Sequence, residues 1–155
     1  MSGVTKMIKG HELFQALSFE EVERLSSFSG SQPMKEGDIV FQGGSLCSQF
    51  FVVLEGRVSL KLPSKDDESS VVVGRMGKGD IFGFPALLGA DQCTTTAVCT
   101  GAGTVLAVDV KPFRKLLEDN ASVGLRVMTV VARAYFTRYI ETLRRFQHVL
   151  DELTR

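Results

Sequence analysis

A glycine-containing stretch near the middle of the chain has the residue types of an anion-binding loop. It reads "IFGFPALLGADQCTTTAVC" from residue 81 to residue 99, with a glycine between two aromatic residues and hydroxyl side chains further on. A short helix entered through glycine presents backbone N–H groups that attract an anion. Yet no arginine lies between Met76 and Phe113, and Lys78 and Lys111 only flank the stretch. The sequence therefore predicts a main-chain cradle that lacks a basic side chain.

The remaining histidines and cysteines do not form a catalytic or metal-binding pattern. His11 and His148 are the only histidines, and a metal site needs several such ligands. The cysteines Cys47, Cys93 and Cys99 form no CxxC pair, and their odd number argues against a disulfide framework. We therefore expect reduced, buried thiols and a cytoplasmic location. No P-loop or Gly-x-Ser-x-Gly motif is present, so we expect no metal and no enzymatic activity.

The composition limits the kinds of molecule that this chain is expected to bind. The chain has 155 residues, of which 44% are hydrophobic and 23% are charged, as expected of one globular domain spanning residues 1–155. Its formal net charge is zero, which argues against direct binding of DNA or RNA. No run approaches the ~18 apolar residues of a membrane span, and no secretory signal begins the chain. We therefore expect neither nucleic acid nor membrane as a partner.

Hydrophobic periodicity divides the chain into three blocks. Residues 10–30 have helical spacing, with Ser18 and Glu21 placed as a capping box. Residues 33–109 consist of short β-branched or aromatic runs separated by glycines, which favours a sandwich or barrel of antiparallel strands. Residues 110–155 are helical, with Pro112 in the first turn of a short helix before a long one.

The long C-terminal helix carries more apolar surface than a small domain requires. About 30 residues without proline would extend ~45 Å. Apolar residues step by three or four along it, which is the spacing of a coiled-coil seam. We expect a homodimer through this seam, although a single wide face packed on the domain itself also fits the pattern. The seam after Leu125 comprises Met128, Ala132, Tyr135, Tyr139, Thr142, Phe146, Val149 and Leu153.

Five segments in order, from about His11 to the C-terminus, resemble the cyclic nucleotide-binding domain of the catabolite activator protein family. They are "LFQALSFEEVERL", "MKEGDIVFQGGSLCSQFFVVLEGRVSL", "GKGDIFGFPALLG", "TTTAVCTGAGTVLAVDVKPFRKLL" and the long helix. The resemblance implies a mainly β fold, an eight-stranded antiparallel β-roll (a jelly roll, or double-stranded β-helix) with flanking helices. The last helix is then both a dimerisation helix and a lid.

Two contacts that define ligand recognition in that family are missing. Members of the family follow the cassette glycine with a glutamate that binds the ribose hydroxyl, and an arginine further on pairs with the cyclic phosphate. Here Phe84 stands at the glutamate position, and Thr94, or less well Cys93, at the arginine position. Hydrogen bonds to a charged group contribute ~1.5–3 kcal/mol each, so losing both would weaken binding by roughly two to four orders of magnitude.

The resemblance implies a non-enzymatic regulatory module that senses a small molecule between the roll and the long helix and passes a signal to a partner protein. The ligand is then a cyclic nucleotide or another small molecule. Two alternatives remain open: a structural dimerisation module whose pocket is filled by Phe84 and Leu87, and a haem or redox sensor that uses Cys93. If Arg155 ends the protein, no helix-turn-helix follows. The candidate ligand-binding residues are Phe82, Gly83, Phe84, Pro85, Ala86, Leu87, Thr94, Thr95, Thr96, Thr137 and Tyr139.

Overall fold

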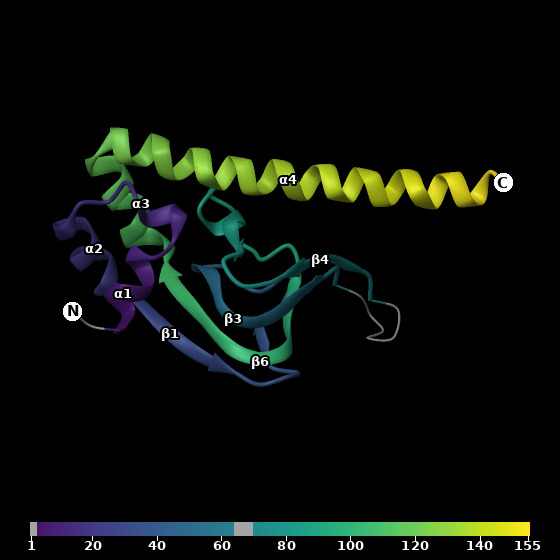
Figure 1. Cartoon of the computed structure of the whole chain (residues 1–155), viewed down its shortest axis with the longest axis horizontal. Helices are drawn as coiled ribbons and strands as arrows, with labels where there is room; N and C mark the ends of the chain where they lie inside the picture. The colour runs from purple at the N-terminus through teal and green to yellow at the C-terminus, as the bar shows by residue number, and fades with distance from the viewer. Residues whose placement is uncertain (1–2, 64–69) are drawn as a thin grey trace.

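A computed structural model describes residues 3–63 and 70–155. The polar segment "PSKDDESS" at 63–70 predicts the tip of a hairpin, and this tip lies mostly outside the described residues. Helices from both ends of the chain cover one end and one side of a six-stranded sheet that is rolled into two layers (Figure 1). The elements are α1 (Gly3–Lys9), η1 (Glu12–Phe14), α2 (Phe19–Ser26), β1 (Ser29–Met34), β2 (Ile39–Phe41), β3 (Gln49–Lys61), β4 (Val72–Met76), β5 (Ile81–Phe82), η3 (Phe84–Ala86), β6 (Thr96–Asp109), α3 (Val110–Asp119) and α4 (Ala121–Leu153).

The long strands β3 and β6 carry the sheet. They pair antiparallel from Gln49 opposite Asp109 to Lys61 opposite Thr96, with register shifts between Val53 and Val58. β1 and β5 extend one half of this pair, whereas β2 and β4 extend the other half. In the described chain, one half of the β3–β6 pair therefore forms the layer β1-β6-β3-β5, and the other half forms the layer β2-β6-β3-β4. The expected antiparallel β-roll is confirmed, and the two long strands serve in both layers.

The first half of β3 is buried on both faces. Successive strand residues point to opposite sides. Phe50 and Val52 therefore pack with the helices, whereas Phe51 and Val53 pack inside the roll. This double burial explains the uninterrupted apolar run "FFVV", which is typical of a strand covered on both sides.

The helices at the N-terminus cover one end of the roll. The expected capping box is present: the Glu21 N–H donates to Ser18 Oγ at 3.2 Å, and the Ser18 N–H donates to Glu21 Oε1 at 2.9 Å. The sequence reading did not anticipate α1, in which Ile8 is buried in the same core. Its seven residues are too few to show a clear helical period.

Helix α4 joins the roll along its first half only. Val123, Val127 and Val131 are buried against the core, whereas every residue of 141–155 is exposed. Figure 1 shows α4 running past the roll and ending well beyond it. No helix among the described residues is both long and apolar enough to span a bilayer.

Close contact between β3 and β6 makes Gly103 a sensitive position. A Cβ atom there would overlap the main-chain carbonyl of Glu55, which is fixed within the paired strands. We expect Gly103→Ala to lower the free energy of unfolding in urea by about 1–3 kcal/mol or more. Gly30→Ala on β1 is the matched control, because a Cβ there meets nothing within 4 Å. Equal stability of the two variants would contradict the close approach of the strands.

Candidate functional site

A cavity of about 260 Å³ lies between the β-roll and α4. Its apolar wall includes Phe41, Leu60 and Val73 from the roll. Tyr135 and Tyr139 from α4 line the side that faces them. The volume is just below the range of about 300–1,000 Å³ for small-molecule sites, which are mostly apolar clefts with a few polar groups. The cavity therefore has the size and lining of a site for a small organic molecule.

Gly83 makes the turn at the rim of this cavity. Its φ is +82°, in the left-handed region that favours glycine. A Cβ there would lie 3.1 Å from Cδ2 of Phe51, so a side chain would also meet a buried ring. The η3 turn that follows has Pro85 in its first turn, and proline has no N–H to donate. The main chain of this turn therefore offers an anion fewer N–H donors than a turn without proline would.

The apolar side chains around Gly83 lie in the core and not on the cavity wall. Phe82, Phe84, Ala86 and Leu87 are all buried. The Phe84 ring lies 6.4 Å from the Phe50 ring and 5.1 Å from the Tyr135 ring, centroid to centroid. Sequence reasoning placed all four among the ligand-binding residues because it treated the loop as a unit. The two residues of this loop that do line the cavity are Gly83 and Pro85.

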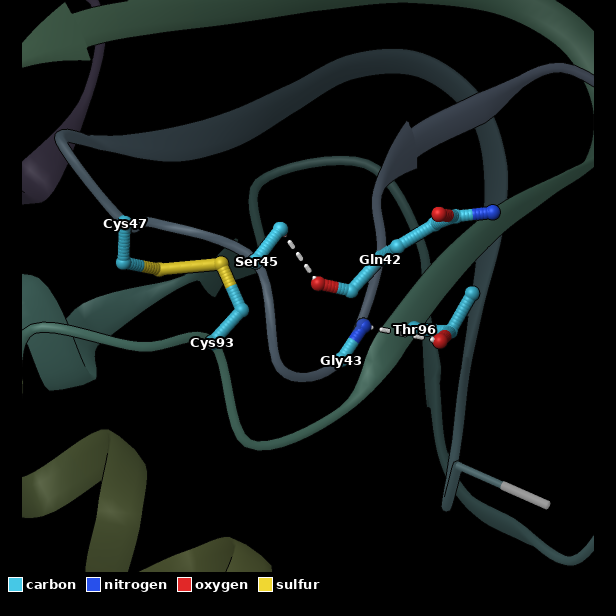
Figure 2. The surroundings of a disulfide bond; sticks show 6 residues. All are labelled: Gln42, Gly43, Ser45, Cys47, Cys93 and Thr96. Carbon is cyan, nitrogen blue, oxygen red and sulfur yellow. Dashed lines mark hydrogen bonds between the residues drawn. A yellow bond between two sulfur atoms is a disulfide. The ribbon is translucent and has the colours of Figure 1, made fainter.

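The expected hydroxyl residues separate into different places. Thr94 and Thr95 line the 260 Å³ cavity, and Tyr139 lines it from α4. Thr96 lies elsewhere, because its Oγ1 accepts a hydrogen bond from the Gly43 N–H at 2.9 Å (Figure 2). Thr137 lines a neighbouring cavity of about 330 Å³ on another side of α4. Three of the five predicted hydroxyl residues thus surround one space.

Cys47 and Cys93 form a disulfide in the wall of the cavity, which corrects the expectation that both are free thiols. Their Cα atoms lie 5.2 Å apart, and Figure 2 shows the bond joining the two loops. The loops are also paired through the backbone, since the Gly44 N–H donates to the Cys93 carbonyl at 2.7 Å. An odd cysteine count is compatible with one bond and one thiol. The separation of 46 residues gave no sequence signal for this pairing.

The disulfide removes the support that free thiols gave to two other expectations. Disulfides are rare in reducing compartments, so the cysteines no longer favour a cytoplasmic location. A sulfur held in a disulfide is no thiolate, so Cys93 in this state cannot serve as an axial haem ligand. Cys99 remains a buried free thiol, and burial, with a smaller contribution from Asp38, raises its pKa.

Sequence reasoning missed Arg138, which lines the cavity from α4. Its Nη2 donates to the Ile81 carbonyl and to the Met76 sulfur, the latter at 3.2 Å. The guanidinium carbon lies 6.0 Å from the Phe84 ring centroid and 5.7 Å from that of Tyr135, within the range of cation–π contacts. Sequence analysis considered basic residues only in and beside the loop, whereas Arg138 lies on α4, more than 50 residues after Gly83. Arg138 has helical spacing from Tyr135 and is adjacent to Tyr139, and this pattern was the sequence signal that could have identified it.

The cysteine assignment predicts how many thiols react. Protein purified without reductant and then unfolded should show one reactive thiol per chain, from Cys99, and three after reduction. In the folded protein Cys99 should react slowly at pH 8, because a raised pKa leaves less thiolate. A thiol-specific chromogenic reagent measures both. Three thiols before reduction would contradict the disulfide.

With the geometry established, known proteins provide a comparison. The family model described as the cyclic nucleotide-binding domain matches residues 31–120. A cAMP-dependent protein kinase regulatory subunit of Mycosarcoma maydis is 30% identical over 138 residues, which cover 89% of this chain and 22% of the relative. The chain spans only 10% to 22% of the length of the curated relatives it matches first.

Solved structures agree in fold. The sensor domain of the transcriptional regulator DNR from Pseudomonas aeruginosa is similar at a TM-score of 0.73, with 19% identity and coverage of 90% of this chain and 98% of that one. Thermus thermophilus catabolite activator protein is similar at a TM-score of 0.65, with 24% identity and coverage of 92% and 63%. The matched region includes the roll, Gly83 and the disulfide-linked loops, and the chain belongs to the cyclic nucleotide-binding domain family.

Proposed function

We propose that the chain is a non-enzymatic regulatory domain that senses a small molecule in the 260 Å³ cavity between the β-roll and α4. The main support for this proposal is that one cavity is lined both by the glycine turn at Gly83 and by side chains of α4 such as Tyr139. A ligand there touches the two parts of the fold at once. Relatives named as a regulatory subunit and as a sensor domain support the same role.

The ligand differs in its contacts from an ordinary cyclic nucleotide ligand. Phe84 stands where a ribose-binding glutamate is expected and is buried in the core. Thr94, at the arginine position, is exposed at the cavity and offers a hydroxyl but no charge. A cyclic nucleotide would meet threonines, main-chain groups and Arg138 of α4 in place of the two family contacts, and a smaller or more apolar ligand would suit the lining better.

Signal output is proposed to pass through α4 to a partner protein. A ligand shifts a conformational equilibrium only if it contacts the two states differently. Tyr135 and Arg138 line the cavity, and they also hold α4 in place through contacts with Phe84 and Ile81, so occupancy would change how this segment of α4 packs. The exposed continuation of α4 over residues 141–155 would then change its angle or its partner contacts.

We propose a parallel homodimer through the exposed apolar side chains of α4. Phe146 and Leu153 are 61% and 75% exposed, and the helix at this point has left the roll behind. Burying such a side chain fully contributes about 1.5–3 kcal/mol. Tyr135 and Met128, also expected at the seam, are half-buried on the domain itself. The dimer contact would therefore lie mostly in the C-terminal half of the expected seam.

A structural dimerisation module is the second candidate. It is favoured by the burial of Phe84 and Leu87, because these two loop side chains serve the core and offer no group to a ligand. This candidate has the same dimer contact but predicts no response to any small molecule. A binding experiment therefore distinguishes the two candidate functions.

A thermal-shift panel of cyclic nucleotides, linear nucleotides and small aromatic acids tests the sensing role. At 100 times its Kd, a ligand should add about 2.7 kcal/mol of stability. Thr94→Arg should strengthen binding of cyclic AMP by roughly ten- to a hundredfold, because it adds a charge-assisted hydrogen bond. Thr100→Arg on the exposed part of β6 is the matched control. No shift with any compound for either protein would favour the dimerisation module.

Sedimentation of the double variant Phe146→Glu/Leu153→Glu tests the dimer. We expect wild-type protein to sediment as two chains and the variant as one, because each substitution places two carboxylates in the proposed contact. Arg144→Glu is the control, because position 144 is about 160° around the helix from position 146. A wild-type monomer at every concentration tested, or a variant that still dimerises, would contradict the seam.

A further inference from the structure

Arg138 is a half-buried cation without a carboxylate partner. Among the described residues it forms no ion pair, whereas Arg133, earlier on α4, pairs with Glu12 at 3.4 Å. Its side chain contacts the Ile81 carbonyl, the Met76 sulfur and the faces of two aromatic rings, all of them neutral. Burial lowers the pKa of the guanidinium, while the Tyr135 side chain and two more distant carboxylates act in the opposite direction. Arginine still stays protonated in such surroundings.

Most of the hydrogen-bonding capacity of Arg138 is unused. A guanidinium has five N–H donors, and both polar contacts of Arg138 go through Nη2. No nitrogen or oxygen of a described side chain is fully buried without a partner. The Nε and Nη1 atoms of Arg138, which have none in the described chain, must therefore keep access to solvent. The spaces that Arg138 lines are the 260 Å³ cavity and the neighbouring 330 Å³ cavity.

The two cavities differ in charge. The larger one already contains the carboxylates Glu12, Asp80 and Glu141 beside its arginines. In the 260 Å³ cavity, Arg138 is the one charged residue among the lining residues of the described chain. The remaining walls are apolar or carry hydroxyl groups, such as Thr94 and Thr95. An anion is accordingly favoured in the smaller cavity, where no carboxylate on the wall opposes it.

We propose that Arg138 is the anion-binding residue of this site, and that its ligand is a small organic anion, a phosphate ester or a carboxylate with an apolar body. This inference rests on the proposed sensing function and assigns the ligand class to it. The guanidinium pairs with the anionic group, and the apolar body lies against Phe41 and Val73. The positive charge absent from the glycine loop is thus supplied by α4. Pairing with the anion would also affect the position of α4, because the same side chain bonds α4 to the Ile81 carbonyl.

The chain contains its own reporter for this site. It has two tyrosines and no tryptophan, and both tyrosines, Tyr135 and Tyr139, line the cavity. All intrinsic tyrosine fluorescence therefore comes from side chains on the cavity wall, and the titrations are run at one fixed protein concentration because both tyrosines also belong to the expected dimer seam. Cyclohexyl phosphate, cyclohexanecarboxylate and cyclohexanol form a set that differs only in the polar group, and none absorbs where tyrosine is excited. The three compounds are titrated into wild-type protein, Arg138→Gln, Arg138→Lys and the exposed control Arg144→Gln.

We expect at least one anion to bind wild-type protein about ten- to a hundredfold more tightly than cyclohexanol, in line with a charge-assisted hydrogen bond. Arg138→Gln should lose this preference while its weak affinity for cyclohexanol stays. Arg138→Lys should keep part of the preference because the charge remains, which also guards against misfolding of the Gln variant. Arg144→Gln should behave as wild type. Comparison of the phosphate with the carboxylate decides which anion the site takes.

Three results would overturn the assignment. If all three compounds bind wild-type protein equally, or if Arg138→Gln retains the anion preference, the cavity is a ligand site but Arg138 does not bind its anion. The sensing proposal would survive both of these results. If no compound changes the tyrosine emission of wild-type protein at any concentration and the nucleotide panel also gives no thermal shift, the cavity takes no ligand. Both proposals would then be wrong.

Discussion

The packing of α4 against the loop after Gly83 is the contact on which the candidate site depends. Phe84 fills the core beneath this loop, and its ring meets both Tyr135 and the Arg138 guanidinium. The cavity exists because α4 crosses here at the distance that these side chains set, with the disulfide closing another part of the wall. The roll alone would leave the loop open to solvent. Because α4 supplies Tyr135, Arg138 and Tyr139 to the wall, a molecule that fills the cavity also contacts α4.

The two parts of α4 have different surroundings, and the proposed output of the site depends on this difference. The first half is fixed by Val123, Val127 and Val131, which are buried in the main core. Every residue of 141–155, by contrast, is exposed. Arg138 lies close to the transition between the halves. A change in its contacts acts at the point where the helix leaves the roll, so a small displacement there moves the exposed end further.

Much of the fold could be predicted from the sequence, because its signals are local. The capping box at Ser18, the change of period after residue 33, the glycine at position 83 and the uninterrupted long helix each depend on nearby residues. The site was less predictable because its members meet across the chain. Cys47 and Cys93 are 46 residues apart, and Arg138 follows Gly83 by more than 50. Phe84 was placed in the ligand site because periodicity does not determine which way a turn residue points.

The most direct measurement of the central claim is a ¹H–¹⁵N spectrum of the arginine Nε–H groups during titration with cyclohexyl phosphate. The account predicts that the Arg138 signal shifts and saturates, while the signals of exposed arginines such as Arg144 move little and without saturation. A guanidinium whose donors face a cavity should respond to an anion that enters it. An Arg138 signal that stays fixed, or moves no more than that of Arg144, would contradict the claim that α4 supplies the charge of this site.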